Sequence, residues 1–170
     1  YYKDSNFDDG DMGAVAPGKN VLEFGQTATF ANYTSYWKGI NGFVIDLNDL
    51  NQTPTTGTIG DFFEFHVGND DTPAGWTAAP SPTLVYQSDV DASGTDRVFF
   101  TWADHAIEST WLEITVLANA ATRLANPEAF YIGNAFGETG NDSATAIVNS
   151  AKLAVARSHH PGFSPTDITA

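Results

Sequence analysis

Carboxylates gathered in loops are the side chains of this sequence best suited to chemistry. They form the groups Asp8, Asp9 and Asp11; Asp70 and Asp71 after Asn69; and Asp89, Asp91 and Asp96. Calcium takes about six to eight oxygen ligands from carboxylates, carbonyls and water, and loops let such oxygens converge. Like charges close together are costly unless they are screened or chelated. We therefore expect calcium as a cofactor, with the candidate ligands Asp8, Asp9, Asp11, Asp70, Asp71 and Asp96; the alternative is that these loops are simply solvated.

Catalytic signatures are missing from the sequence. It has no Gly-x-Ser-x-Gly, no His-Glu-x-x-His, no phosphate-binding loop and no dinucleotide-binding glycine motif. Asp104, His105 and Glu108 could supply an acid and a base, but a polar turn after a strand explains them equally well. His159 and His160 lack the converging third ligand that zinc requires. Cysteine is absent, which excludes thiolate chemistry and disulfides. We expect a protein that is not an enzyme.

Aromatic side chains make up 13% of the chain and suggest a contact surface. Tyr36, Trp37 and Trp76 stand in polar, loop-like surroundings, where a ring can stack on a sugar or a partner chain or can fill the core. Trp102 and Trp111 stand at strand ends, where core positions are expected. Glycosylation sequons begin at Asn32, Asn51 and Asn141, although so short a pattern also arises by chance.

Charge and composition narrow the partners and the location. The chain has 21 acidic residues against seven lysines and arginines, and the net charge of -14 repels nucleic acids and anionic membrane surfaces. No apolar run approaches the roughly 20 residues that cross a bilayer, so we expect no membrane insertion. The acidic, lysine-poor, cysteine-free composition predicts an extracellular or cell-surface protein after removal of its signal peptide. A cytosolic protein of a salt-adapted organism would have a similar composition.

Short segments rich in β-branched and aromatic residues predict an all-β fold. The expected strands are residues 21–30, 42–47, 62–67, 83–86, 97–102, 111–117 and 129–132. Turn-forming runs separate them without intervening helices, which favours an antiparallel β-sandwich of jelly-roll type. Within 111–117, Leu112, Ile114 and Val116 should face the core and Glu113 the other side. The apolar run 42–47 is expected at the centre of a sheet, and residues 146–157 are predicted as one short helix.

The chain is expected to be one domain, residues 1–170, with short arms at about 1–7 and 159–170. The arms carry the large side chains Tyr1, Tyr2, Phe7, Phe163 and Ile168. An arm of another copy could complete an open sheet edge by strand addition. Repeated exchange would build a surface fibre or lattice. The alternative is that both arms fold back on their own domain or stay disordered.

Several segments of the chain together carry a family resemblance. They are residues 25–36, 39–42, 96–98, 101–104 with 106–107, 111–112 with 115–118, and 130–141. They resemble the terminal domain of large secreted planctomycete-type bacterial proteins, which a dockerin-like calcium repeat often follows. The resemblance runs from about Phe7 to Arg157 and implies an extracellular β-rich module. Asn141, Ser143 and Thr145 hold early positions of that family's calcium loop. Lys152 stands at the last position, where an ammonium would repel calcium, so we expect no site there.

Two functional hypotheses follow from the sequence. The first is a non-enzymatic extracellular structural module that assembles with other copies of itself into a fibre or lattice. The alternative is a calcium-assisted carbohydrate-binding or adhesion module, with a polysaccharide as partner and Tyr36, Trp37 and Trp76 as contact residues. Neither hypothesis involves nucleic acid.

Overall fold

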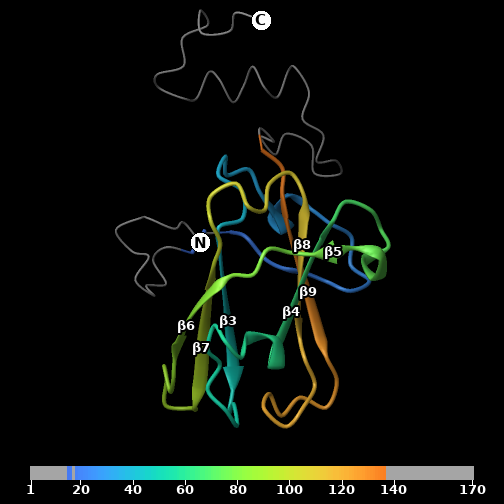
Figure 1. Cartoon of the computed structure of the whole chain (residues 1–170). Helices are drawn as coiled ribbons and strands as arrows, with labels where there is room; N and C mark the ends of the chain where they lie inside the picture. The colour runs from blue at the N-terminus through green and yellow to red at the C-terminus, as the bar shows by residue number, and fades with distance from the viewer. Residues whose placement is uncertain (1–14, 17, 137–170) are drawn as a thin grey trace, which may run out of the picture.

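The computed structural model describes residues 15, 16 and 18–136, which form two β-sheets and almost no helix (Figure 1). The six-stranded sheet has the order β1-β9-β8-β4-β5, with β2 also paired to β9, and the three-stranded sheet has the order β3-β7-β6. This confirms the predicted sandwich-like all-β fold. The predicted helix at 146–157 and both arms, with Tyr1, Tyr2, Phe7, Phe163 and Ile168, lie outside the described residues.

Most predicted strands are found within a few residues of their expected bounds. The strands are β1 Leu22–Glu23, β2 Tyr33–Thr34, β3 Gly42–Asn48, β4 Phe63–Gly68, β5 Thr77–Ala78, β6 Thr83–Gln87, β7 Thr95–Thr101, β8 Trp111–Val116 and β9 Glu128–Asn134. Short 3-10 turns lie at η2 Phe30–Asn32, η3 Ile59–Asp61 and η4 Pro73–Gly75. Pairing is antiparallel except between β2 and β9, which run parallel. In the described part of the chain, no helix is long and apolar enough to span a membrane.

The predicted strand at 21–30 is wrong over most of its length. Only Leu22 and Glu23 pair with β9. The chain then turns at Gly25, whose φ of 81° is a left-handed conformation that suits glycine. Farther on, the Thr29 amide donates to Asn32 Oδ1 at 2.8 Å, which stabilises η2 instead of an extended strand. Local turn chemistry therefore overrides the β-propensity of this segment.

The centre of the three-stranded sheet is β7 and not β3. Among the described residues β3 pairs with β7 alone, so the expectation that 42–47 is a central strand is wrong. Val98, Phe99 and Phe100 of β7 are all buried, which means that both faces of this strand are covered. A continuous apolar run thus shows that a strand is covered, but neighbouring strands decide its place in the sheet.

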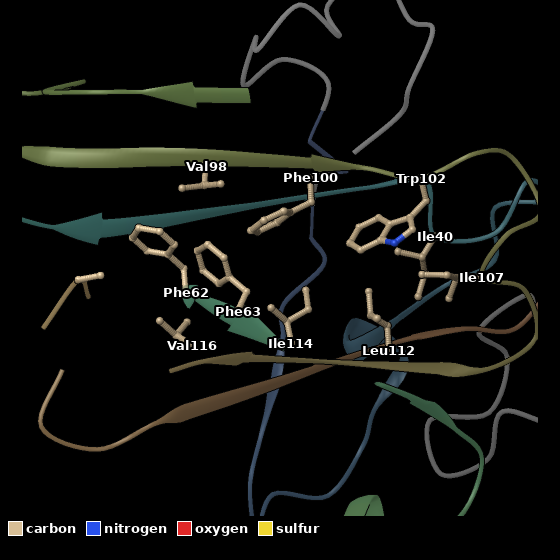
Figure 2. Packing of buried hydrophobic residues seen from close by; sticks show 11 residues of the cluster. Ile40, Phe62, Phe63, Val98, Phe100, Trp102, Ile107, Leu112, Ile114 and Val116 are labelled. Atoms are coloured by element: carbon tan, nitrogen blue, oxygen red, sulfur yellow. The ribbon is translucent and has the colours of Figure 1, made fainter. Parts of the chain in front are cut away.

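The hydrophobic core lies between the two sheets (Figure 2). Leu112, Ile114 and Val116 of β8 are completely buried, as the alternation of this strand predicts. The Phe100 ring of the facing sheet meets the Phe63 ring edge-on, with 4.9 Å between ring centroids. Trp102 is also buried and donates from Nε1 to the Pro80 carbonyl at 2.7 Å. This packing fixes β4 and β8 and therefore fixes the side chains on their opposite, outward face.

Candidate functional site

The outward face of the six-stranded sheet carries a row in which glycines alternate with aromatic residues. Gly68 of β4 pairs with Trp111 of β8, Trp111 pairs with Gly133 of β9, and Gly133 pairs with Tyr33 of β2. A Cβ at Gly133 would come within 3.2 Å of the Trp111 ring, so this ring lies directly over the glycine. Glycine in a strand permits such a close approach. Large rings can therefore lie flat against this face.

The connection between β4 and β5 places Trp76 on the same face. Asp70 Oδ1 accepts the Thr72 amide at 2.9 Å and closes a turn, after which Pro73 begins η4. The Trp76 amide donates to the Pro73 carbonyl at 2.9 Å, and its indole Nε1 donates to Asp70 Oδ1 at 3.0 Å. A Cβ at Gly68 would overlap the indole, which therefore fills the space above this glycine. Trp76 is thus held by its backbone, its ring nitrogen and the sheet below it.

Tyr131, Glu113 and His66 form the polar floor beside Trp76. The Tyr131 hydroxyl donates to Glu113 Oε1 at 2.8 Å, and the Trp76 and Tyr131 rings meet edge-on with centroids 5.9 Å apart. Burial, together with the hydrogen bond and the charge of Glu113, raises the pKa of Tyr131 to about 12. His66 Nδ1 is buried and lies 3.3 Å from Glu113 Oε2, without the alignment of a hydrogen bond. The Tyr131 hydroxyl therefore stays protonated at neutral pH and holds Glu113 in place.

Phe24 lines the same hollows as Trp76 and lies at the corner of a turn. The Gln26 amide donates to the Glu23 carbonyl at 3.2 Å, and Gly25 supplies the left-handed conformation that a type II turn needs at its third position. Phe24 occupies the second position, and 84% of it is exposed to solvent. The turn therefore presents a large apolar ring that the core does not use.

These residues define the Trp76 groove, which consists of two adjoining hollows. Both hollows are lined by Phe24, Asp71, Pro73, Trp76 and Tyr131. The polar hollow has a volume of about 410 Å³ and adds His66 and Glu113. The apolar hollow has a volume of about 420 Å³ and adds Leu22 and Trp111. Ligand sites typically have mostly apolar and aromatic walls with a few placed polar groups, and the apolar hollow has this form.

The groove is acidic. Its carboxylates are Glu23, Asp70, Asp71 and Glu113, and no lysine or arginine of the described residues lines it. Among all the residues that the structure describes, no group of three or more histidines and carboxylates could hold a metal ion. The groove therefore combines hydrogen-bond acceptors with faces of aromatic rings.

The three aromatic residues predicted as contacts do not share one surface. Trp76 lines the groove. Trp37 is half exposed at another place, where its ring centroid lies 5.3 Å from that of His105 and 6.5 Å from that of Tyr36. Tyr36 also lines a separate cavity of about 180 Å³ next to Ile40. Only Trp76 among the three therefore belongs to the groove.

The residues considered for acid and base chemistry are paired with each other and with a lysine. His105 Nδ1 lies 2.9 Å from Glu108 Oε2. Asp104 Oδ2 lies 2.8 Å from Lys38 Nζ, and Asp104 Oδ1 accepts from the Asn41 side chain at 3.2 Å. These contacts tie the loop after β7 to the chain before β3. His159 and His160 lie outside the described residues.

The predicted calcium ligands are dispersed. Asp70 and Asp71 lie beside Trp76, whereas Asp96 is buried in the other sheet. There it accepts the Leu50 amide at 2.9 Å and the Tyr86 hydroxyl at 2.7 Å. Asp8, Asp9 and Asp11 lie outside the described residues. Asp96 thus acts as a buried hydrogen-bond acceptor that joins three segments of the chain.

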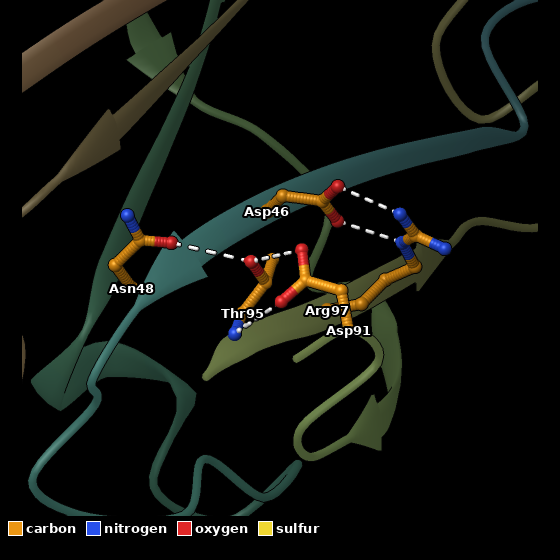
Figure 3. Close-up of polar contacts among 5 residues, drawn as sticks. All are labelled: Asp46, Asn48, Asp91, Thr95 and Arg97. Carbon is orange, nitrogen blue, oxygen red and sulfur yellow. Dashed lines mark hydrogen bonds and ion pairs between the residues drawn. The ribbon is translucent and has the colours of Figure 1, made fainter. Parts of the chain in front are cut away.

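Asp91 belongs to a polar network at one end of β7 (Figure 3). Thr95 Oγ1 donates to Asp91 at 2.7 Å, and the Ser93 and Thr95 amides donate to it at 2.9 and 3.2 Å. These bonds hold the pKa of Asp91 down to about 2. Beside it, Arg97 donates two hydrogen bonds of 2.7 Å to Asp46. Protein donors of the same loop and of β7 therefore satisfy the Asp91 carboxylate.

The predicted glycosylation positions differ in how exposed the asparagine side chain is to solvent. Asn32 is buried, and its Nδ2 donates to the carbonyls of Asn20 and Val21 at 3.2 Å, which leaves no free amide hydrogen for a glycan. Asn51 is exposed and accepts from Arg123 at 3.4 Å. Asn141 lies outside the described residues.

Sequence reasoning missed Phe24, His66, Glu113 and Tyr131 as site residues. The two-residue alternation of the predicted strands does place Glu113 away from the core, and the same rule applied to 62–67 and 129–132 gives outward positions to His66 and Tyr131. The alternation could therefore have shown that these side chains face outward. It could not show that β4, β8 and β9 are neighbours.

Comparisons with known proteins do not identify a family for this chain. It was compared with protein-family models, curated proteins and solved structures, and none of these comparisons found a match. The resemblance to the terminal domain of secreted planctomycete-type proteins stays a prediction. Function is therefore argued from the Trp76 groove.

Proposed function

We propose that this domain is a carbohydrate-binding module that holds neutral sugars in the Trp76 groove. The observation that carries the proposal is the pairing of a fixed Trp76 and an exposed Phe24 with a lining of carboxylates. A sugar ring has an apolar C–H face that packs on aromatic rings and hydroxyl groups that donate to carboxylates. The groove offers both kinds of partner side by side.

The constraints on Trp76 support binding with little loss of conformational freedom. Its indole rests on Gly68 and donates to Asp70, and it meets the Tyr131 ring edge-on. Tyr131 in turn holds Glu113. Side chains that are ordered before the ligand arrives add affinity, because their ordering does not have to occur on binding.

The proposal includes the setting of the module. We place it outside the cell, as its acidic, cysteine-free composition suggests. We also propose that it has no catalytic activity, because its sequence lacks the usual catalytic motifs. We also propose a jelly-roll winding, which is supported by the passage of the chain between the sheets from β3 to β4, from β5 to β6 and from β7 to β8.

A glycan array followed by calorimetry tests the proposal. Wild-type protein should bind at least one neutral oligosaccharide, and Trp76→Ala should weaken that binding about 30-fold, the effect of removing a residue worth about 2 kcal/mol at a contact centre. Trp37→Ala is the matched control, because Trp37 is exposed elsewhere, and it should bind normally. Trp76→Phe keeps a stacking ring without the Asp70 bond and should show an intermediate loss.

Two results would overturn the proposal. One is the absence of any bound glycan with folded wild-type protein. The other is unchanged affinity in a Trp76→Ala variant whose circular dichroism shows an intact β fold.

A further inference from the structure

We propose that the Trp76 groove selects uncharged glycans of at least two sugar units, with one unit in each hollow. In this arrangement Phe24 contacts both units, and Asp71 and Glu113 reject acidic sugars. This inference rests on the proposed function and names the ligand class of the same site.

The requirement for at least two sugar units follows from the division of the groove into two hollows. Each hollow, at about 410 and about 420 Å³, falls toward the lower end of the usual range for small-molecule sites. His66 and Glu113 line only the polar hollow, whereas Leu22 and Trp111 line only the apolar one. A ligand that contacts both sets must extend across the residues that line both hollows, among them Trp76 and Tyr131. A single sugar can use only one hollow and gains only part of the contact.

Phe24 supplies the contact that the two hollows share. It lines both of them, and the turn closed between Glu23 and Gln26 holds it at a corner with 84% of its surface exposed. An apolar ring so exposed gains by burial against a ligand. Because the core does not depend on this ring, its removal should affect binding and leave the fold intact.

The selection against acidic sugars follows from the negative charge of the groove. Asp71 lines both hollows, Glu113 adds a second carboxylate to the polar one, and Glu23 and Asp70 add to the apolar one. No cationic lysine or arginine of the described chain offsets them there. A uronate or sulfate would meet like charges there, and the repulsion is strongest at Glu113, whose side chain is only 13% exposed. The net charge of -14 acts in the same direction at long range.

The length requirement is tested with single sugars, dimers and tetramers of each neutral glycan that the array identifies. The tetramer should bind at least about tenfold more tightly than the single sugar. Phe24→Ala should lose about tenfold in affinity for the tetramer, which corresponds to about 1.4 kcal/mol. Val85→Ala is the control, because Val85 is also exposed but lies on β6 of the other sheet. Equal affinity at all lengths, or normal binding by Phe24→Ala, overturns the two-hollow arrangement.

The charge selection is tested with neutral, amino and uronate forms of one oligosaccharide backbone at low salt. Wild-type protein should prefer the neutral form over the uronate form by at least about tenfold and should bind the amino form no more weakly than the neutral one. Glu113→Gln keeps an acceptor for Tyr131 and should narrow the preference against uronate. Glu64→Gln is the matched control, since Glu64 is exposed on β4 but does not line the groove. A preference unchanged by Glu113→Gln, or uronate bound as tightly as the neutral form, overturns the charge selection.

These outcomes are distinct from failure of the proposed function. Glycan binding that depends on Trp76 but not on length or charge leaves the carbohydrate-binding function standing and removes this inference. If the protein binds an oligolysine peptide and no glycan, both the carbohydrate-binding function and this inference are wrong. A basic peptide is the alternative ligand because it also suits an acidic aromatic groove.

Discussion

Replacing Gly68 by alanine tests directly whether the sheet below positions Trp76. The new Cβ would come closer to the indole than the 3.0 Å below which real Cβ contacts are essentially never found. The surrounding strand is held by its pairing with β8, so the loop that carries Trp76 is the part that must move. We expect the indole to leave its place above the sheet and to lose its bond to Asp70.

The loss of stability follows from the contacts that are broken. A hydrogen bond such as that from Trp76 Nε1 to Asp70 contributes about 1 kcal/mol net. The edge-on contact with Tyr131 contributes about 0.5–1.5 kcal/mol. Alanine in place of glycine stabilises the folded state by about 0.4–1 kcal/mol, because it restricts the conformations of the unfolded chain. We therefore expect Gly68→Ala to lower the free energy of unfolding by about 1 kcal/mol.

Urea denaturation and NMR together measure both parts of this prediction. The midpoint should fall at an unchanged slope, and the indole N–H signal of Trp76, assigned with Trp76→Phe, should shift. Gly60→Ala is the control, because a Cβ there meets nothing within 4 Å, and it should change stability by less than about 0.5 kcal/mol. If Gly68→Ala is as stable as wild type and the Trp76 signal does not move, the indole does not rest on Gly68 and the proposed groove wall is incorrect.

Four other predictions concern stability, ions and assembly. Asp96→Ala should lower the free energy of unfolding in urea by about 2–4 kcal/mol, because it leaves the Leu50 amide and the Tyr86 hydroxyl without their acceptor; a change below about 1 kcal/mol would contradict that role. The pKa of Tyr131, raised to about 12 from an unfolded value of about 10, means that its stabilising effect is complete below pH 10 and is lost as the pH rises from about 10 to 12. Denaturation followed across that range, with Tyr131→Phe as control, checks this, and identical alkaline profiles would refute it. If the acidic loops bind calcium, a chelator should lower the Tm, since a ligand at 100 times its Kd adds about 2.7 kcal/mol; an unchanged Tm would exclude the ion. Electron microscopy should show fibres or lattices of the full chain that are lost without residues 1–7 or 159–170, and monomers in all three samples would exclude arm exchange.

Local patterns in the sequence were sufficient to find most strands. The alternation around Leu112 and Ile114 predicts which side of β8 faces the core, because successive side chains of a strand point to opposite faces. The same reasoning failed at residues 21–30, where a glycine turn and the contact between Thr29 and Asn32 interrupt a segment of high β-propensity. Propensity describes a residue type, whereas these interruptions depend on specific hydrogen bonds.

The acidic residues also show that the sequence alone does not determine the role of a side chain. Asp70, Asp91 and Asp96 look alike in the sequence, as carboxylates near turns. In the fold, Asp70 holds an indole, Asp91 accepts donors within its own loop, and Asp96 is buried between Leu50 and Tyr86. Which donors reach a carboxylate depends on chain segments distant in sequence, so its role cannot be derived from its neighbours alone.

By itself the sequence determined the all-β class, the outward position of Glu113 and the aromatic and acidic character of the chain, because composition and two-residue periodicity are local properties. Only the tertiary structure decided that Trp76, Phe24 and Tyr131 share one groove and that Trp37 does not. That groove depends on the order β9-β8-β4 and on glycines that leave room for rings on the sheet face. Strand order results from packing of the whole core. Which ring lies over a given glycine can be stated only when the neighbouring strands are known.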